Sequence, residues 1–317
     1  MAAAGRQSST AEKLGSVFAL EREAHGVAER LPDLLLDADR IAATVSHGIH
    51  GRRRAGPGET FWQFRQYQTN DSAQLIDWRR SASSDHLFVR EREWEAAHTM
   101  WLWPDLSASM NFRSHLSKST KRDRGIVLML AAAELLVRGG ERVGLLGVTA
   151  PTSSRKATTR IAEAIATQGE TAAMRESLPP RATLSRFSSA VLISDFLDPI
   201  EAIRERVEHL ASGGVSGHLV QVLDPAEETL PYDGRVEFLA SEGGVRVTAD
   251  RVETLRDEYR RRLLAHRDEL AGIARRVQWT LHVHHTDRPA ASALLALYSS
   301  LAGLSGGEIA RQGAPTP

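Results

Sequence analysis

Residues 99–109 have the sequence TMWLWPDLSAS, and this stretch decides the fold class. Its first five residues are apolar or favour β-structure, as expected for a buried strand. Asp105, Ser107 and Ser109 then follow at alternate positions of a short loop. An apolar-rich segment, residues 119–138, comes next and stops at a pair of glycines, which predicts a helix. The stretch therefore predicts a strand, a polar loop and a helix, which together open an α/β domain.

The same alternation continues toward the end of the chain. The segments predicted as strands are residues 99–103, 142–149, 190–194, 216–223 and 277–283. The segments predicted as helices are residues 119–138, 160–168, 199–211, 250–276 and 289–302. Strands that alternate with helices form a parallel sheet with helices on both faces. The predicted fold is a doubly wound α/β domain with a mostly parallel sheet.

The region before residue 99 has a different composition. Five of the six tryptophans fall between Trp62 and Trp103, interleaved with charged residues. Short runs rich in aromatic and β-branched residues within this region predict strands. The predicted divisions are an N-terminal helical and partly disordered segment at 1–44, a small β-rich domain at 45–98, the sheet domain at 99–305 and a flexible tail at 306–317.

The polar loop after the first strand predicts a metal site. Ligands of doubly wound sheets bind beyond the carboxyl ends of the strands, where the strand order reverses. Asp195 ends a later strand, so we expect Asp105 and Asp195 to face one cation. Carboxylate and hydroxyl oxygens suit Mg²⁺ or Mn²⁺. The candidate ligands are Asp105, Ser107, Ser109 and Asp195, with Thr158 or Thr159 from the loop after the second strand.

A structural explanation stands beside the metal site. Asp and Ser residues commonly cap helices, so residues 105–109 alone are equally well explained as the start of a helix. The second carboxylate at a matching strand end favours the metal interpretation.

Two further clusters are weaker candidates. His282 and His284 lie two residues apart in a predicted strand and would face the same side, but polar strand ends are common and no third ligand is evident. The run Arg52–Arg54 lies near aromatic residues, yet acidic residues are interspersed through the same region. We therefore expect neither a histidine metal site nor a nucleic-acid surface.

Composition narrows the classes of function. The 317 residues include 40 acidic and 40 basic ones, and a chain of zero net charge has no global field that attracts nucleic acid or anionic lipid. The absence of cysteine excludes disulfides, thiolate metal sites and cysteine catalysis. No apolar run approaches the ~20 residues of a membrane helix, and no secretory signal is recognisable. We expect a cytoplasmic protein that does not insert into a membrane.

A family resemblance joins these observations. The Asp-x-Ser-x-Ser loop, a threonine-containing loop and a later strand that ends in aspartate resemble the metal-ion-dependent adhesion site of von Willebrand factor A domains. The preceding block resembles the DUF58 family, whose members are von Willebrand A-like and associated with MoxR-type AAA+ ATPases. The positions that carry this second resemblance are Gly56, Gly58, Phe61, Arg65, Tyr67, Asp71, Ile76, Asp77, Trp78, Val89, Arg90 and Glu91.

The chain departs from these patterns at three places. Asn70 and Gln74 stand where the DUF58 family usually has glycine and arginine, and Ser194-Asp195-Phe196 replaces the Thr-Asp-Gly of adhesion domains. Many relatives also carry N-terminal membrane helices, so the resemblance implies a short soluble form.

The resemblance implies a non-enzymatic adaptor. A bound Mg²⁺ or Mn²⁺ would offer an open position to a partner's carboxylate, and the partners would be a MoxR-type ATPase and a client protein. The alternative is a metal-dependent phosphohydrolase or nuclease that uses Asp105 and Asp195. Binding is favoured because the sequence has neither a P-loop nor a Gly-x-Ser-x-Gly nucleophile motif.

Overall fold

The structure, a computed structural model, describes residues 33–46, 61–67, 76–82, 84, 86–92, 98–168, 176–239 and 246–312. The chain divides into two compact units, one formed by residues 1–47 with 98–317 and the other by residues 48–97.

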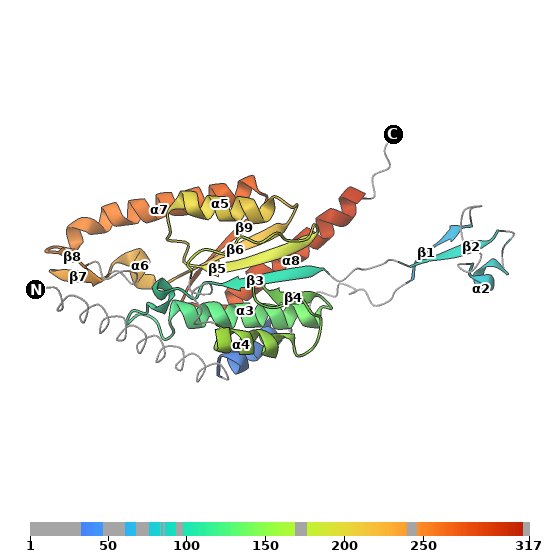
Figure 1. Cartoon of the computed structure of the whole chain (residues 1–317), viewed down its shortest axis with the longest axis horizontal. Helices are drawn as coiled ribbons and strands as arrows, with labels where there is room; N and C mark the ends of the chain where they lie inside the picture. Colours follow the sequence, from blue (N-terminus) through green and yellow to red (C-terminus); the bar gives the residue numbers. More distant parts are fainter. Residues whose placement is uncertain are drawn as a thin grey trace, which may run out of the picture. The chain divides into compact units, whose positions relative to one another are not determined.

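A five-stranded sheet forms the centre of the larger unit, and each of its neighbouring strands pairs in parallel (Figure 1). The strand order is β4-β3-β5-β6-β9, so the chain moves outward from β3 in both directions. The strands are β3 (Thr99–Pro104), β4 (Arg142–Leu145), β5 (Ser188–Ser194), β6 (Ser216–Leu223) and β9 (Thr280–His285). This order confirms the predicted doubly wound α/β fold with a parallel sheet.

Helices cover both faces of this sheet, as predicted. Figure 1 shows α5 and α7 on one face and α3, α4 and α8 on the other. The helices are α3 (Lys121–Arg138), α4 (Ala157–Gln168), α5 (Ile200–Ala211), α7 (Glu253–Arg276) and α8 (Ala290–Gln312). Shorter elements are the 3₁₀ turn η2 (Ala108–Asn111), helix α6 (Pro225–Thr229) and the antiparallel pair β7 (Val236–Leu239) and β8 (Arg246–Ala249).

The core between the sheet and helices α5 and α7 contains Trp103 and Trp279. The indole nitrogen of Trp279 donates a hydrogen bond to the carbonyl of Val215 at 2.9 Å. Its ring lies directly against Gly217, where an added Cβ would come within 2.3 Å of ring carbon. Glycine at position 217 therefore makes room for the tryptophan. Strand β5, the middle strand, is buried along its whole length.

The smaller unit contains β1 (Phe61–Gln66), helix α2 (Trp78–Ser81) and β2 (Phe88–Arg92). The two strands are antiparallel, and a register shift between Phe61 and Gln63 interrupts their pairing. Asp77 caps α2 by accepting a hydrogen bond from the Arg80 backbone. Several residues that the sequence analysis singled out lie outside the described residues. They are Arg52–Arg54, from the possible nucleic-acid surface, and Gly56, Gly58, Asn70, Asp71 and Gln74, from the family resemblance.

The last helix is longer than predicted. The sequence places its end near residue 302 and a flexible tail at 306–317, whereas α8 extends to Gln312. The prediction took the glycine, proline and polar residues after Gly306 as the sign of a frayed tail. Glycine within a helix costs about 1 kcal/mol relative to alanine, which weakens a helix without ending it.

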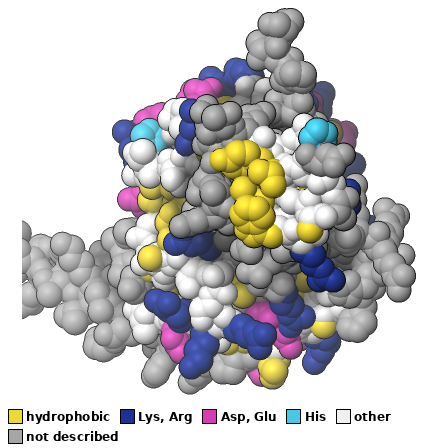
Figure 2. All heavy atoms as spheres, turned by 90° about the vertical axis from the view of Figure 1, so that its right-hand side faces the viewer, with side chains coloured by type: hydrophobic (Ala, Val, Ile, Leu, Met, Phe, Trp, Pro, Cys, Tyr) yellow, Lys and Arg dark blue, Asp and Glu magenta, His cyan; other side chains and the backbone are white. Residues whose placement is uncertain are grey.

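Two observations bear on the predicted environment. In the view of Figure 2, basic and acidic side chains are interspersed, and the largest group of exposed hydrophobic side chains lies near the centre, with smaller ones elsewhere. Among the described residues, no helix is both long and apolar enough to cross a membrane.

Candidate functional site at the carboxyl edge of the sheet

The candidate site lies where β3 and β5 end side by side. The chain leaves β3 toward β4 on one side and later returns to form β5 on the other, which makes this the point where the strand order reverses. The backbone N–H of Asp105 donates to the carbonyl of Ile193 at 2.8 Å, which aligns the two strand ends. Asp105 and Asp195 are therefore brought to one edge, and both are 1% exposed.

Asp105 is held by its own loop and by the neighbouring strand. Its Oδ1 accepts a hydrogen bond from the backbone of Ser107 at 2.8 Å, and its Oδ2 accepts one from the hydroxyl of Ser194 at 2.6 Å. Burial raises the pKa of Asp105 to about 7, although hydrogen bonds from Ser107 and Ser194 oppose that shift. A substantial fraction of Asp105 therefore carries a proton at neutral pH.

The two loop serines lie beside Asp105. Ser107 is fully buried, and its hydroxyl lies 3.2 Å from that of Ser109. The structure thus brings together four of the six predicted ligands, Asp105, Ser107, Ser109 and Asp195.

A lysine that the sequence analysis did not select reaches into the same edge. Lys121 opens helix α3, and its side chain is 1% exposed. Its Nζ lies 2.8 Å from Asp195 Oδ2 and 2.5 Å from Glu227 Oε1. Burial disfavours the charged form, but the two carboxylates outweigh it and raise the pKa of Lys121. The lysine is an ammonium ion wedged between two carboxylates.

Asp195 accepts two further hydrogen bonds, one at its side chain and one at its backbone carbonyl. Its Oδ1 accepts a hydrogen bond from the backbone of Leu197 at 3.2 Å. The side-chain amide of Gln221 on β6 donates to the Asp195 carbonyl at 2.9 Å. The Asp195 carboxylate is thus paired at both oxygens without an added ion.

Helix α6 positions Glu227 through a capping box. Asp224 Oδ1 accepts a hydrogen bond from the backbone of Ala226, while Glu227 Oε2 accepts one from the backbone of Asp224 at 2.8 Å. The other oxygen of Glu227 is the one that faces Lys121. The sequence Asp-Pro-Ala-Glu thereby fixes an acid beside the strand ends.

The same capping box holds the loop before α3. The hydroxyl of Ser114 donates to Asp224 Oδ1 at 2.5 Å, and its backbone N–H donates to Oδ2 at 2.9 Å. Asp224 is fully buried. Helix α6 therefore fixes both Lys121 and the loop of residues 112–118.

Thr158 and Thr159 lie elsewhere. The Thr158 hydroxyl donates to Glu134 Oε2 at 2.9 Å, and Glu134 is thirteen residues after Lys121 in α3. At 1.5 Å per residue that separation is about 20 Å along the helix. The structure thus does not bring Thr158, or its helical neighbour Thr159, to Asp105.

A turn after β4 explains this difference from the prediction. Thr152 pairs with Val143 in an antiparallel bridge, so the chain reverses direction after β4. The reversal carries the following residues back toward the amino ends of the strands, where α4 begins. The sequence did not indicate this reversal.

The assembled residues do not fit a divalent ion. Within the described residues, no three His, Asp or Glu side chains are grouped as metal ligands. The ammonium of Lys121 already contacts Asp195, the predicted second ligand. A charge of +2 placed 4 Å from that ammonium would be repelled by about 8 kcal/mol at an effective dielectric constant of 20. No step of a mechanism is therefore assigned to a metal here.

The phosphohydrolase alternative requires a substrate to reach Asp105 and Asp195. Asp105, Asp195 and Lys121 are each 1% exposed, so neither carboxylate lies on the surface of this structure. Surface groups at this edge are more accessible. Phe112, Leu116 and Leu197 are 39%, 42% and 40% exposed, respectively.

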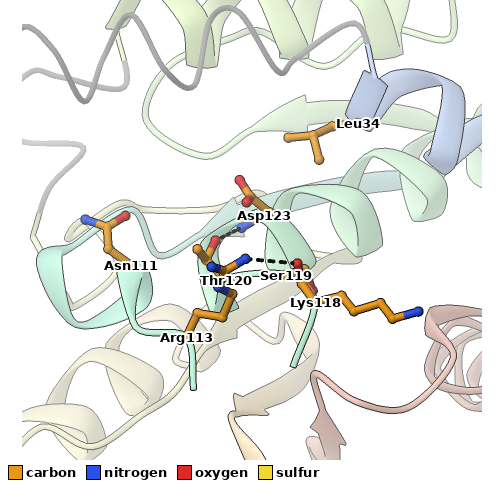
Figure 3. A pocket seen from close by; sticks show the side chains of 7 residues that line it. All are labelled: Leu34, Asn111, Arg113, Lys118, Ser119, Thr120 and Asp123. Atoms are coloured by element: carbon orange, nitrogen blue, oxygen red, sulfur yellow. Dashed lines mark hydrogen bonds between the residues drawn. The ribbon is translucent and has the colours of Figure 1, made fainter. Parts of the chain in front are cut away.

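A pocket of about 680 Å³ adjoins this edge at the start of α3 (Figure 3). Thr120 caps α3 by accepting a hydrogen bond from the backbone of Asp123 at 3.0 Å. The lining residues are Leu34, Asn111, Arg113, Lys118, Ser119, Thr120 and Asp123. Both basic and acidic groups line the pocket, so its charge selects no particular ligand.

One signal in the sequence pointed to Lys121. The positive end of a helix dipole disfavours a cation in the first turn, so a lysine there indicates acidic partners nearby. The sequence does not reveal that those partners are Asp195 and Glu227, which lie 74 and 106 residues away.

Two uncharacterized mycobacterial proteins are similar to this chain in sequence. A protein of Mycobacterium tuberculosis (strain ATCC 25618 / H37Rv) is 32% identical over 266 residues, which cover 77% of this chain and 80% of the relative. A protein of Mycobacterium bovis (strain ATCC BAA-935 / AF2122/97) matches with the same identity and coverage.

Two solved structures show a weaker likeness, each at 16% sequence identity. An aerotolerance-related membrane protein from Bacteroides fragilis NCTC 9343 matches with a TM-score of 0.38, over 64% of this chain and 98% of that chain. The conserved hypothetical protein BatB from Bacteroides thetaiotaomicron matches with a TM-score of 0.36, over 65% and 100%.

The family described as "Protein of unknown function DUF58" matches residues 63–269, about two thirds of the chain. This range includes the loop of Asp105, the start of α3 and helix α6. Together with the mycobacterial relatives, the match establishes that the chain belongs to the DUF58 family.

Proposed function

We propose that this protein is a non-enzymatic, cytoplasmic adaptor that binds other proteins at the carboxyl edge of its sheet and works with a MoxR-type AAA+ ATPase on a client protein. The observation that carries this proposal is the loop of residues 112–118, which is anchored by hydrogen bonds to the buried Asp224 and exposes two large apolar side chains, Phe112 and Leu116, to solvent. The ATPase partner rests on the family resemblance. The chain has no P-loop of its own, which is compatible with reliance on a separate ATPase.

The anchoring of the loop favours binding. Ser114 is fixed by two hydrogen bonds to the buried Asp224, and the backbone of Lys121 donates to the carbonyl of Phe112 at 3.2 Å. A surface that is already ordered loses little conformational entropy when a partner binds.

The exposed side chains suggest the chemistry of the partner. Phe112 and Leu116 are large apolar groups that would be buried in a complex. Arg113, His115 and Lys118 are exposed between and beside them, and the loop contains no acid. We expect an acidic segment of the partner with at least one apolar anchor residue.

The exposed apolar side chains lie next to the buried charged residues. The ring of Phe112 lies 5.9 Å from Lys121 Nζ, and Leu197 follows two residues after Asp195. The cluster of Lys121, Asp195 and Glu227 therefore supports the surface from below, and the proposal assigns it no part in catalysis.

The test measures binding of the purified MoxR-type ATPase of the same organism by titration calorimetry, with and without ATP. The double variant Phe112→Ala/Leu116→Ser should weaken binding at least tenfold. The matched control is Leu264→Ser, which alters another exposed leucine, on α7, and should leave affinity unchanged.

Two results would count against the proposal. Equal affinity of the double variant and the wild type would remove the loop from the interface. An absence of binding between wild-type protein and ATPase would remove the proposed partner.

A further inference from the structure

We infer that the ammonium group of Lys121 is the built-in cation of the sheet edge and takes the place that a divalent ion holds in metal-ion-dependent adhesion sites. The binding edge of this chain would then be independent of metal. The inference concerns the interior of the edge, so it stands or falls separately from the proposed ATPase partner.

The position of Lys121 is the first support. Its ammonium joins three separate elements, because it is carried by α3 and contacts Asp195 after β5 and Glu227 in α6. The ring of Phe112 lies near the same group. An ammonium has three N–H donors, and two of them are used by these carboxylates. Two carboxylates thus hold the ammonium, and one of them, Asp195, is a residue that the sequence analysis predicted as a metal ligand.

The occupied state of the acids is the second support. Asp195 is paired at both oxygens, by Lys121 and by the backbone of Leu197. Both oxygens of Asp105 also accept hydrogen bonds, from Ser107 and Ser194. The acids that a divalent ion would need are already satisfied by the protein itself.

The choice of lysine is the third support. Four of the 40 basic residues are lysines, at positions 13, 118, 121 and 156, and the rest are arginines. A compact ammonium suits the space of an ion, whereas a planar guanidinium is larger and has a fixed fork of donors. Lys121, one of these four lysines, supplies such a compact charge to the buried carboxylates.

The first experiment titrates Mn²⁺ into three proteins and follows bound metal by electron paramagnetic resonance. Wild type should bind no Mn²⁺ at the edge, and neither Mg²⁺ nor EDTA should change its melting temperature. Lys121→Ala should gain one Mn²⁺ site and melt at a higher temperature with Mn²⁺ than without. The double variant Lys121→Ala/Asp195→Asn should lose that gain.

Two outcomes would overturn the inference. One is a stoichiometric Mn²⁺ site in wild type that disappears in Asp195→Asn. The other is a folded Lys121→Ala that gains no Mn²⁺ binding. If Lys121→Ala does not fold, the wild-type titration still decides whether the edge binds metal.

A second measurement uses only wild-type protein. Amine acetylation followed by mass spectrometry compares Lys121 with Lys118, an exposed lysine three residues earlier. Lys121 should react at least tenfold more slowly, and the rate should be the same with Mg²⁺ and with EDTA. Equal rates for the two lysines, or a rate for Lys121 that depends on Mg²⁺, would contradict the inference.

Discussion

The ion pairs at the sheet edge and those on helix α7 are built from similar groups but lie in opposite environments. The side chains of Lys121 and Asp195 are 1% and 2% exposed, whereas those of Arg262 and Glu258 on α7 are 80% and 45% exposed. When a buried charge loses its partner, no water is available to solvate the remaining charge, whereas an exposed charge is solvated by bulk water. The comparison teaches that burial decides which pairs the fold depends on.

The largest expected effect is at Lys121. Replacing it by methionine keeps most of the volume but leaves Asp195 and Glu227 without their shared cation. We expect a loss of about 3–5 kcal/mol in the free energy of unfolding, measured by urea denaturation. If the loss of unfolding free energy were as small as that for an exposed ion pair, burial would not decide which pairs the fold depends on.

Acidic pH tests buried groups that have no counter-charge. Burial lowers the pKa of His218 and of His284 to about 4, below the ordinary value of 6.5. The unfolded chain therefore takes up protons that the folded chain does not as the pH falls below 6.5. Each histidine should lower stability by roughly 2 kcal/mol between pH 7 and pH 5.

The measurement compares urea midpoints at the two pH values for wild type and for His218→Gln/His284→Gln. The double variant should lose this part of the pH dependence. Asp105 acts in the opposite sense, because its raised pKa stabilises the folded state at low pH and this contribution is lost as the pH rises toward 7. Asp105 is present in both proteins, so the comparison isolates the contribution of the two histidines. The prediction would be contradicted if the urea midpoint changed equally between the two pH values in both proteins.

An intermediate effect is expected at Ser114. Ser114→Ala removes the hydroxyl donor to the buried Asp224 but keeps the backbone hydrogen bond. Hydrogen bonds to charged groups contribute about 1.5–3 kcal/mol, and we expect a loss in that range. Hydrogen exchange of residues 112–118 should also become faster. Unchanged exchange would show that Asp224 does not order the loop.

The smallest effect is expected on α7. Arg262→Ala removes an exposed pair with Glu258, which is also contacted by Arg261. The urea midpoint should stay within experimental error of wild type, since exposed pairs contribute little. A clear destabilisation would show that exposure alone does not separate the two classes of ion pair.

Much of the fold was predictable because it depends on local pattern. The strand of β3, the polar loop of Asp105 and the helix α3 follow from hydrophobic runs and glycine stops that are close in sequence. Asp195 was also predictable, because parallel strands bring their carboxyl ends to one edge.

The rest of the site depends on contacts between distant segments. A capping box within residues 224–227 fixes the side chain of Glu227, and this local pattern does not reveal that Lys121, 106 residues earlier, lies beside it. Thr158 was placed wrongly near the metal ligands because the reversal at Val143 and Thr152 was not recognised. The site could be located from the sequence, but the partners of its buried lysine could not.

The covalent attachment of Lys121 to helix α3 has a consequence for control. A diffusing ion leaves and returns at a rate set by its concentration, whereas a tethered ammonium has a local concentration that the cell cannot alter. Withdrawing it requires a movement of the protein itself, such as local unfolding of the first turn of α3. Control of this edge would therefore act through the conformation of residues 112–121 rather than through the supply of an ion.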